Sequence, residues 1–232
     1  MKKLVSVIIP AKDEQASIGK VLKDLNEVIK KTKKYDFEVI VIDDKSKDKT
    51  SNIARKFRVK AIRNKGESGK GKAIALGFKH AKGDYIVMLD ADYSHQPEEI
   101  PEYLNKLDNG YGLIVGSRHF GGSEEYDIVR YLGNFFLTGT FRLFFGIQLS
   151  DALNGFKAFK RSIIDNHNYK SKDFEIEIEL IANALREKEK IGEIPSHERA
   201  RFGGKMKSFA PLHGTKFLLK IISEGIRLRL GF

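Results

Sequence analysis

The first half of the chain alternates short apolar runs with amphipathic segments, and this alternation limits the fold more than any single motif does. The apolar runs predict strands at residues 4–10, 37–44, 59–63, 84–92 and 111–118. The intervening segments predict helices at residues 16–31, 49–57, 71–81 and 97–107. Strands that alternate with helices in this way form a mostly parallel sheet with helices on both faces. We therefore predict an α/β fold.

The second half has a different character. Residues 128–149 contain five phenylalanines, and apolar side chains would surround almost the whole of a helix formed there. This pattern is typical of burial, of a subunit contact or of a membrane surface. Residues 215–230 predict an amphipathic basic helix whose only acid is Glu224. We expect a main domain at residues 1–211, followed by a C-terminal helix at 212–232 that contacts a membrane surface or another subunit.

Polar or acidic residues follow three of the predicted strands. In parallel sheets, ligands bind beyond the carboxyl ends of the strands. The residues at those ends are 10–14, Asp43 with Asp44, and 90–94. We expect them to lie together and to form the functional site. For Asp43 and Asp44, a turn followed by a helix N-cap is an alternative that is compatible with a ligand contact.

The stretch Gly66–Ala73 reads GESGKGKA and at first sight looks like a phosphate-binding P-loop. A P-loop requires Gly-x-x-x-x-Gly-Lys followed by Ser or Thr, whose hydroxyl reaches Mg²⁺. Here Asn64 stands in place of the first glycine, and Gly71 follows Lys70. The spacing therefore argues against a P-loop and leaves the purpose of the loop open.

The sharpest candidate for chemistry is Asp90-Ala91-Asp92, at the end of a predicted strand. Side chains two residues apart in an extended segment point the same way, so the two carboxylates converge on one point. Oxygen-only ligation suits Mg²⁺ or Mn²⁺. A polar turn is the simpler alternative, because Asp-x-Asp is common by chance.

The composition limits the kinds of partner and of site that this protein can have. The net charge of +11 favours an anionic partner, such as a phosphorylated substrate, anionic lipid or nucleic acid. The absence of cysteine excludes disulfides, thiolate metal sites and cysteine nucleophiles. No signal peptide and no uninterrupted apolar run of about 18 residues is visible, so we expect a soluble or peripheral protein.

Taken in order, the segments VSVIIPAKDE, VIVIDDKSKDKT, GKGKAIALG, GDYIVMLDADYSHQPEEIP, IVGSR and DALNGFKAF resemble glycosyltransferase family 2. The resemblance is to its polyprenyl-phosphate sugar transferases, the dolichol-phosphate mannose and glucose synthase group, and covers about residues 4–208. It implies a GT-A fold, a nucleotide-sugar donor, a divalent cation (Mg²⁺ or Mn²⁺) and inverting transfer of a hexose to polyprenyl or dolichyl phosphate. It also implies peripheral attachment to the cytoplasmic membrane face, with a membrane-protein subunit as a further partner to be tested.

The resemblance assigns roles residue by residue. The positions that match the nucleotide-sugar contacts are Pro10, Lys12, Glu14, Asp43, Asp44, Lys70, Asp90 and Ala91. The metal positions are Asp90, Asp92 and Ser94, and the catalytic positions are Asp92 and Arg118. The cations that match the acceptor-phosphate contacts are Arg118, Arg130, Arg201 and Lys207. For each of these cations, a solvated surface position is the alternative.

Two motifs depart from the pattern of the relatives. Met206 stands where relatives have a serine, which puts one hydroxyl contact to phosphate in doubt. The segment Asn154–Lys157 reads NGFK where relatives often read SGFR.

The residue types at these positions suit the reaction that the resemblance implies. A divalent cation on Asp90 and Asp92 would stabilise the negative charge of a departing diphosphate. A phosphate monoester is already anionic at neutral pH, so as an acceptor it needs cations to hold it in line and no strong base. Arginine suits such contacts because it binds phosphate with two parallel hydrogen bonds.

Three other functions compete with this interpretation. Transfer to a glycan or a protein would need a carboxylate base, for which Asp151, Glu175 and Glu177 are candidates. A nucleic-acid-binding module would use the positive charge, but no recognisable RNA- or DNA-binding motif is present. A scaffold that binds a nucleotide sugar without transferring it is the third.

Overall fold

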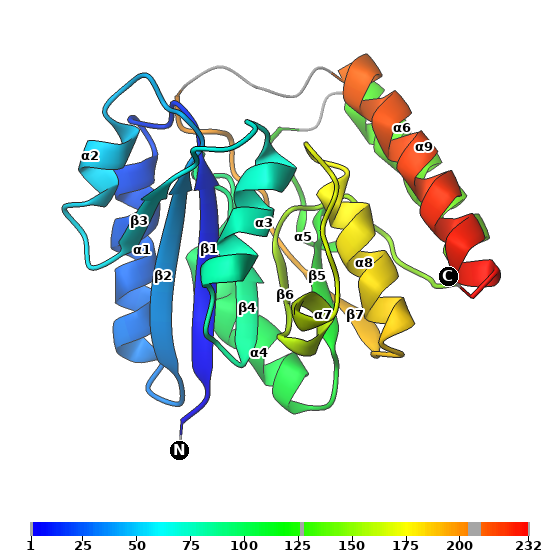
Figure 1. The fold of residues 1–232 in the computed structure, drawn as a ribbon, viewed down its shortest axis with the longest axis horizontal. Helices are drawn as coiled ribbons and strands as arrows, with labels where there is room; N and C mark the ends of the chain where they lie inside the picture. Colours follow the sequence, from blue (N-terminus) through cyan, green and yellow to red (C-terminus); the bar gives the residue numbers. More distant parts are fainter. Residues whose placement is uncertain (1, 126–127, 204–209, 232) are drawn as a thin grey trace.

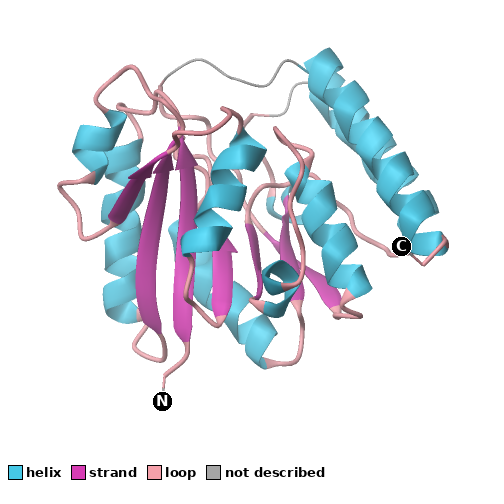
Figure 2. Ribbon diagram, viewed as in Figure 1, coloured by secondary structure: helices cyan, strands magenta, loops and turns pink. Residues whose placement is uncertain are grey.

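A computed structural model describes residues 2–125, 128–203 and 210–231. Its centre is a seven-stranded sheet of order β3-β2-β1-β4-β6-β5-β7. The strands are β1 (Leu4–Ala11), β2 (Asp36–Asp43), β3 (Lys60–Arg63), β4 (Tyr85–Met88), β5 (Leu113–Ser117), β6 (Lys157–Lys160) and β7 (Ile191–Pro195). Helices cover both faces of this sheet (Figures 1 and 2), which confirms the predicted mostly parallel α/β fold.

The alternation of the first half is present as predicted, with shifted boundaries. The helices between the strands are α1 (Ile18–Lys31), α2 (Thr50–Ala54), α3 (Lys70–His80), the 3₁₀ turn η1 (Pro97–Glu99) and α4 (Ile100–Asp108). β1 pairs in parallel with both β2 and β4. The carboxyl ends of these three strands therefore meet at one edge of the sheet.

The second half contributes one antiparallel strand. β6 lies between β4 and β5 and runs antiparallel to both, whereas β7 pairs in parallel with β5. The sequence pattern predicted neither β6 nor β7. The helices of this half are α5 (Arg118–Gly121), α6 (Ile128–Phe145), α7 (Ser162–Asp165), α8 (Ile176–Arg186) and α9 (Ala210–Arg229).

Two apolar cores lie on the two faces of the sheet, because successive strand residues point to opposite faces. Val7 and Ile9 of β1 belong to the core under α1 and α4, whereas Ile8 belongs to the core under α3 and α8. Phe141 of α6 and Ile221 of α9 extend the second core.

The C-terminal helix α9 packs along α6 and against α8 (Figure 1). Glu224 of α9 is buried and accepts a hydrogen bond from Arg186 of α8 at 2.7 Å. Gly225 allows close approach, since a Cβ there would come within 2.6 Å of Phe144. In the part of the chain that the structure describes, no helix is long and apolar enough to cross a membrane.

Candidate functional site

The glycines of GESGKGKA permit close backbone packing. A Cβ on Gly71 would lie 2.5 Å from the carbonyl oxygen of Ser171. A Cβ on Gly69, which has a φ of 151°, would lie 2.3 Å from the carbonyl oxygen of Lys172. These glycines therefore let residues 171–173 lie against the first turn of α3, with Lys70 at its start.

Asp44 fixes this loop at the end of β2. Its buried carboxylate accepts hydrogen bonds from Asn64 at 2.7 Å, from the Ser68 hydroxyl at 2.7 Å and from the Gly69 amide at 2.9 Å. Asn64 stands where a P-loop would have its first glycine, and its side chain braces the turn. The loop is held by side-chain contacts that a P-loop does not have.

A first cavity, of about 330 Å³, opens beside this loop. We call it the outer cavity. Seven of the eight residues predicted to contact the nucleotide sugar line it: Pro10, Lys12, Glu14, Asp44, Lys70, Asp90 and Ala91. Asp43 does not line it. Its buried carboxylate accepts from the guanidinium of Arg63 at 2.6 Å and from the amide of Ser46 at 2.8 Å.

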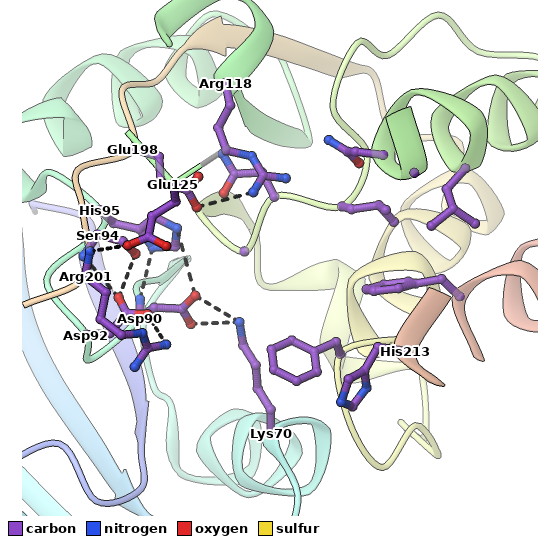
Figure 3. A pocket seen from close by; sticks show the side chains of 18 of the residues that line it. Lys70, Asp90, Asp92, Ser94, His95, Arg118, Glu125, Glu198, Arg201 and His213 are labelled. Atoms are coloured by element: carbon purple, nitrogen blue, oxygen red, sulfur yellow. Dashed lines mark hydrogen bonds and ion pairs between the residues drawn. The ribbon is translucent and has the colours of Figure 1, made fainter. Parts of the chain in front are cut away.

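Lys70 and Asp90 line the outer cavity and contact each other (Figure 3). The Lys70 ammonium lies 2.8 Å and 3.0 Å from the two carboxylate oxygens of Asp90. Burial disfavours the ionised form of Asp90, but the charge and hydrogen bond of Lys70, together with His95 and Arg201, outweigh it and hold the pKa of this carboxyl well below its usual range. The main-chain amide of Asp90 donates to Nδ1 of His95 at 3.1 Å.

Asp92 is held from two sides. The Ser94 hydroxyl donates to one of its oxygens at 2.6 Å, and Arg201 donates to the other at 2.7 Å. The same guanidinium donates to Glu14 at 2.9 Å. Arg201 lies in the loop that follows β7. Two main-chain hydrogen bonds also hold this loop against the segment after β4, because Arg199 N donates to Ser94 O and Phe202 N donates to Asp92 O. Arg201 therefore lies at the carboxylates, although its predicted role is at the acceptor phosphate.

The donor set suits a hard divalent cation. The described residues contain no group of three or more acidic, His or Cys side chains placed to hold a metal by themselves. Mg²⁺, however, is usually bound by one or two carboxylates, with substrate phosphates and water completing its ligands. Asp90 and Asp92 supply two such carboxylates, and the Ser94 hydroxyl lies beside them.

A second cavity, of about 280 Å³, lies beyond these acids. We call it the inner cavity. It shares a wall with the outer cavity, formed by Lys70, Asp90, Asp92, Phe174, Arg201 and His213. Figure 3 shows Lys70, Arg118, Arg201 and His213 around this space. A ligand with two negatively charged groups could therefore span the acids from one cavity to the other.

Arg118 lines the inner cavity and is paired with acids. Its guanidinium binds the buried carboxylate of Asp151 through two nitrogens, at 2.6 Å and 2.9 Å, and lies 3.3 Å from Glu198. Burial disfavours ionised Asp151, but the charge and hydrogen bonds of Arg118, with a hydrogen bond from Asn134, together lower its pKa to about 2. Arg118 is therefore rigidly oriented.

Arg130 and Lys207 lie outside the described side chains, so their predicted acceptor contacts stay predictions.

Several cavity residues escaped the sequence analysis. Phe174 and His213 lie at the shared wall with their rings 4.9 Å apart. Asn134 of α6 donates to Asp151 at 3.1 Å, and Glu198 contacts Arg118. These residues lie in four separate segments of the chain. Asn134 and His213 lie in segments that were predicted to contact a membrane or another subunit, and no local pattern assigned them to the site.

Each candidate base of the glycan or protein alternative has at least one carboxylate oxygen in a contact, but Glu175 Oε2 and Glu177 Oε1 accept no hydrogen bond from a described residue. Asp151 pairs with Arg118, and Glu177 is buried against Lys157 at 2.8 Å. Glu175 accepts hydrogen bonds from the amides of Lys172 and Asp173. A carboxyl with a low pKa, such as Asp151, makes a poor general base at neutral pH.

Residues 6–167 match the family model described as glycosyl transferase family 2. The chain therefore belongs to this family, and its sheet is that of a GT-A fold. A dolichol-phosphate mannosyltransferase of Pyrococcus furiosus is 29% identical over 199 residues, which cover 82% of this chain and 55% of the relative. The chain thus spans about half the length of that relative.

Two further comparisons extend over nearly the whole chain. An uncharacterized protein of Methanocaldococcus jannaschii is 31% identical over 232 residues, which cover 96% of this chain and 92% of the relative. A crystal structure of glucosyl-3-phosphoglycerate synthase from Mycobacterium tuberculosis, in complex with Mn²⁺, uridine diphosphate and phosphoglyceric acid, superposes with a TM-score of 0.76. That likeness covers 96% of this chain and 78% of the other at 20% identity, and it supports the fold.

Proposed function

We propose that this chain transfers a hexose from a nucleotide sugar, of the GDP-mannose or UDP-glucose type, to polyprenyl or dolichyl phosphate. The observation that carries the proposal is the wall of charged residues between the outer and inner cavities. A nucleotide would lie in the outer cavity and its diphosphate at Asp90 and Asp92. The sugar would then enter the inner cavity, where the acceptor phosphate meets it.

The bond changes define what each group must do. The bond between the anomeric carbon and the donor diphosphate breaks, and an oxygen of the acceptor phosphate forms the new bond with inversion. Asp90 and Asp92, with Ser94 beside them, would hold Mg²⁺ or Mn²⁺. That cation would stabilise the charge on the departing diphosphate. Lys70 would add a positive charge at the same place.

The acceptor phosphate needs cations and no base. We assign this role to Arg118, Arg130, Arg201 and Lys207, with Arg118 held in orientation by Asp151. The pairing of Asp151 with Arg118, which lowers the pKa of this carboxyl, supports a phosphate acceptor over a glycan or protein acceptor that would need Asp151 as its base. The name of the Pyrococcus relative agrees with a polyprenyl-phosphate acceptor, and the Mycobacterium structure with a divalent metal and a nucleotide.

The acceptor also suggests where the protein works. We assign catalysis to residues 1–211 and membrane contact to residues 212–232 together with α6. Exposed apolar side chains on these helices, among them Phe135, Phe136 and Leu219, support peripheral attachment to the cytoplasmic membrane face. A separate membrane-protein subunit could contribute to the same attachment.

A transfer assay tests the proposal. GDP-mannose, UDP-glucose and UDP-N-acetylglucosamine would each be supplied with Mn²⁺ and a short polyprenyl phosphate, and the lipid product identified by mass spectrometry. We expect one donor to give a hexosyl phosphoryl lipid. Transfer to a free oligosaccharide, with none to the lipid phosphate, would reject the acceptor assignment.

A further inference from the structure

Glu177 carries a carboxylate oxygen that the proposed chemistry leaves unexplained. Its side chain is almost fully buried, and one oxygen, Oε2, accepts from Lys157 at 2.8 Å. The other oxygen, Oε1, is buried and accepts no hydrogen bond from any described residue. It lies 3.6 Å from the Lys70 ammonium, just beyond hydrogen-bond reach. An unsatisfied buried carboxylate oxygen is costly, so its persistence needs a reason.

Lys157 fixes the direction of that oxygen. This lysine lies on β6, is fully buried, and also donates to the main-chain carbonyl of Asn154. Because Lys157 holds Oε2, the carboxylate cannot turn away, and Oε1 stays aimed at Lys70. Asp90, Lys70, Glu177 and Lys157 thus form a row of alternating charges.

Gly155 keeps open the space between the three groups nearest the cavity. A Cβ at this position would lie 3.0 Å from the Lys70 ammonium, 3.1 Å from Asp90 Oδ2 and 3.4 Å from Glu177 Oε1. Any larger residue would fill the gap through which the ammonium could pass from one carboxylate to the other.

We propose that Glu177 is the second anionic partner of Lys70, and that it receives the ammonium when a divalent cation occupies the Asp90 carboxylate. Lys70 contacts both carboxylate oxygens of Asp90, and a divalent cation bound to Asp90 would need these same oxygens. The vacant Oε1 of Glu177 is the nearest other anion for the displaced charge. Glu177 and Lys157 are then positioning residues that keep Lys70 beside the donor diphosphate. This inference rests on the metal role in the proposed function.

The test measures binding of Mn²⁺ alone to the full chain, by electron paramagnetic resonance titration, without donor or acceptor. Glu177→Gln keeps an oxygen for Lys157 but removes the charge offered to Lys70. We expect Mn²⁺ affinity to fall about tenfold, because the displaced ammonium loses its partner. Lys157→Arg keeps a cation beside Oε2, and relatives often have arginine at this position, so Mn²⁺ affinity should stay within about twofold of wild type. Glu224→Gln, another buried acid, is the matched control and should also leave Mn²⁺ binding unchanged.

A double-mutant cycle shows whether Glu177 affects Mn²⁺ binding through Lys70 or through the long-range electrostatic effect of its charge. In a Lys70→Met background, Glu177→Gln should have almost no further effect on Mn²⁺ affinity. An undiminished effect in that background would show that Glu177 acts through space, and would overturn the proposal. Glu177→Gln combined with Lys157→Met, which removes both buried charges, should repeat the loss in a folded protein; normal Mn²⁺ affinity there would likewise overturn it.

These experiments distinguish failure of this inference from failure of the proposed function. A wild type that binds Mn²⁺ and shows the coupling, but transfers no sugar, keeps the inference and rejects the function. A wild type that transfers sugar while Glu177→Gln binds Mn²⁺ normally rejects the inference alone.

Discussion

Arg201 and Asp92 are joined by a 2.7 Å hydrogen bond between opposite charges, so the loop that follows β7 reaches back onto the end of β4. The same guanidinium contacts Glu14 at 2.9 Å. Arg201 thereby holds together two acids that repel each other and neutralises one of the two proposed metal ligands. A cation that binds Asp92 must compete with this contact.

Removal of Arg201 should therefore strengthen metal binding and weaken transfer. We expect Arg201→Ala to bind Mn²⁺ roughly tenfold more tightly, since a hydrogen bond between charged groups is worth about 1.5 kcal/mol net. Transfer to the lipid phosphate should fall, because the acceptor loses a cation. Titration with Mn²⁺ and a transfer assay measure the two effects, with Arg199→Ala on the same loop as the control. Unchanged Mn²⁺ affinity would show that Arg201 does not compete for this site.

The paired acids should be required for transfer. Asp92→Asn keeps the size of the side chain and its contact with Ser94 but removes one charge from the leaving-group site. We expect transfer to fall by about 10²–10³-fold, the usual loss when one strong electrostatic stabiliser is removed. The thermal unfolding midpoint should show that the variant still folds. Full activity of the variant, or of wild type in excess chelator, would contradict the metal role.

Lys70 should serve the donor nucleotide sugar and not ATP. Its ammonium lies on the wall between the two cavities, and its loop lacks the P-loop spacing. We expect Lys70→Ala to weaken binding of the preferred nucleotide sugar, measured by calorimetry, and wild type to show no ATPase activity. Lys72→Ala, one residue beyond Gly71, is the control. ATP hydrolysis that disappeared in Lys70→Ala would restore the P-loop interpretation.

The sequence predicted the parts of this site that lie on local patterns. The strand ends at Asp44 and Asp90, and the lysine of the glycine loop, line one cavity because parallel strands bring their carboxyl ends to one edge. Local patterns could not show that Arg201 meets Asp92, since 109 residues separate them. Local patterns also did not predict β6, which pairs antiparallel with β4 and brings Lys157 into contact with Glu177. Such contacts depend on topology and not on periodicity.

The buried pair of Asp151 and Arg118 should make stability depend on pH. Burial opposes ionisation of Asp151, but Arg118 lowers its pKa to about 2 from an ordinary value of 3.8. A lowered folded-state pKa adds stability above the unfolded value, and this stability is lost as the pH falls from about 4 towards 2. The lowered pKa of Asp151 contributes about 2 kcal/mol to the free energy of unfolding at neutral pH. Asp151→Asn should therefore unfold more readily at neutral pH and lose this part of the acid dependence.

Urea unfolding of wild type and Asp151→Asn at several pH values measures the effect. Asp165→Asn, which removes an exposed partner of Arg161, is the control and should change stability little. Equal slopes of stability against pH for wild type and Asp151→Asn below pH 4 would contradict the assignment.

The membrane contact should depend on apolar side chains of α6 more than on the charges of α9. The basic helix predicted at residues 215–230 carries Lys216, Lys220, Arg227 and Arg229, which would attract anionic lipid. In the structure Lys216 pairs with Asp173 at 2.7 Å, and Lys220 lies 3.1 Å from Glu224. Phe135 and Phe136, by contrast, are each 62% exposed. Full burial of such a side chain contributes about 1.5–3 kcal/mol, against roughly 1 kcal/mol for each basic residue near anionic lipid.

We therefore expect Phe135→Ser with Phe136→Ser to reduce co-sedimentation with anionic vesicles at low and at high salt. Arg227→Gln with Arg229→Gln should reduce it at low salt alone. Lys23→Gln on α1, at the other end of the molecule (Figure 1), is the control and should bind normally. Deletion of the chain after Gly214 is a poorer test, because it would also uncover the buried surface around Ile221 and leave Arg186 without Glu224. If the intact protein ignores anionic vesicles at low salt, or meets its acceptor only with a membrane subunit, attachment through α6 and α9 alone is wrong.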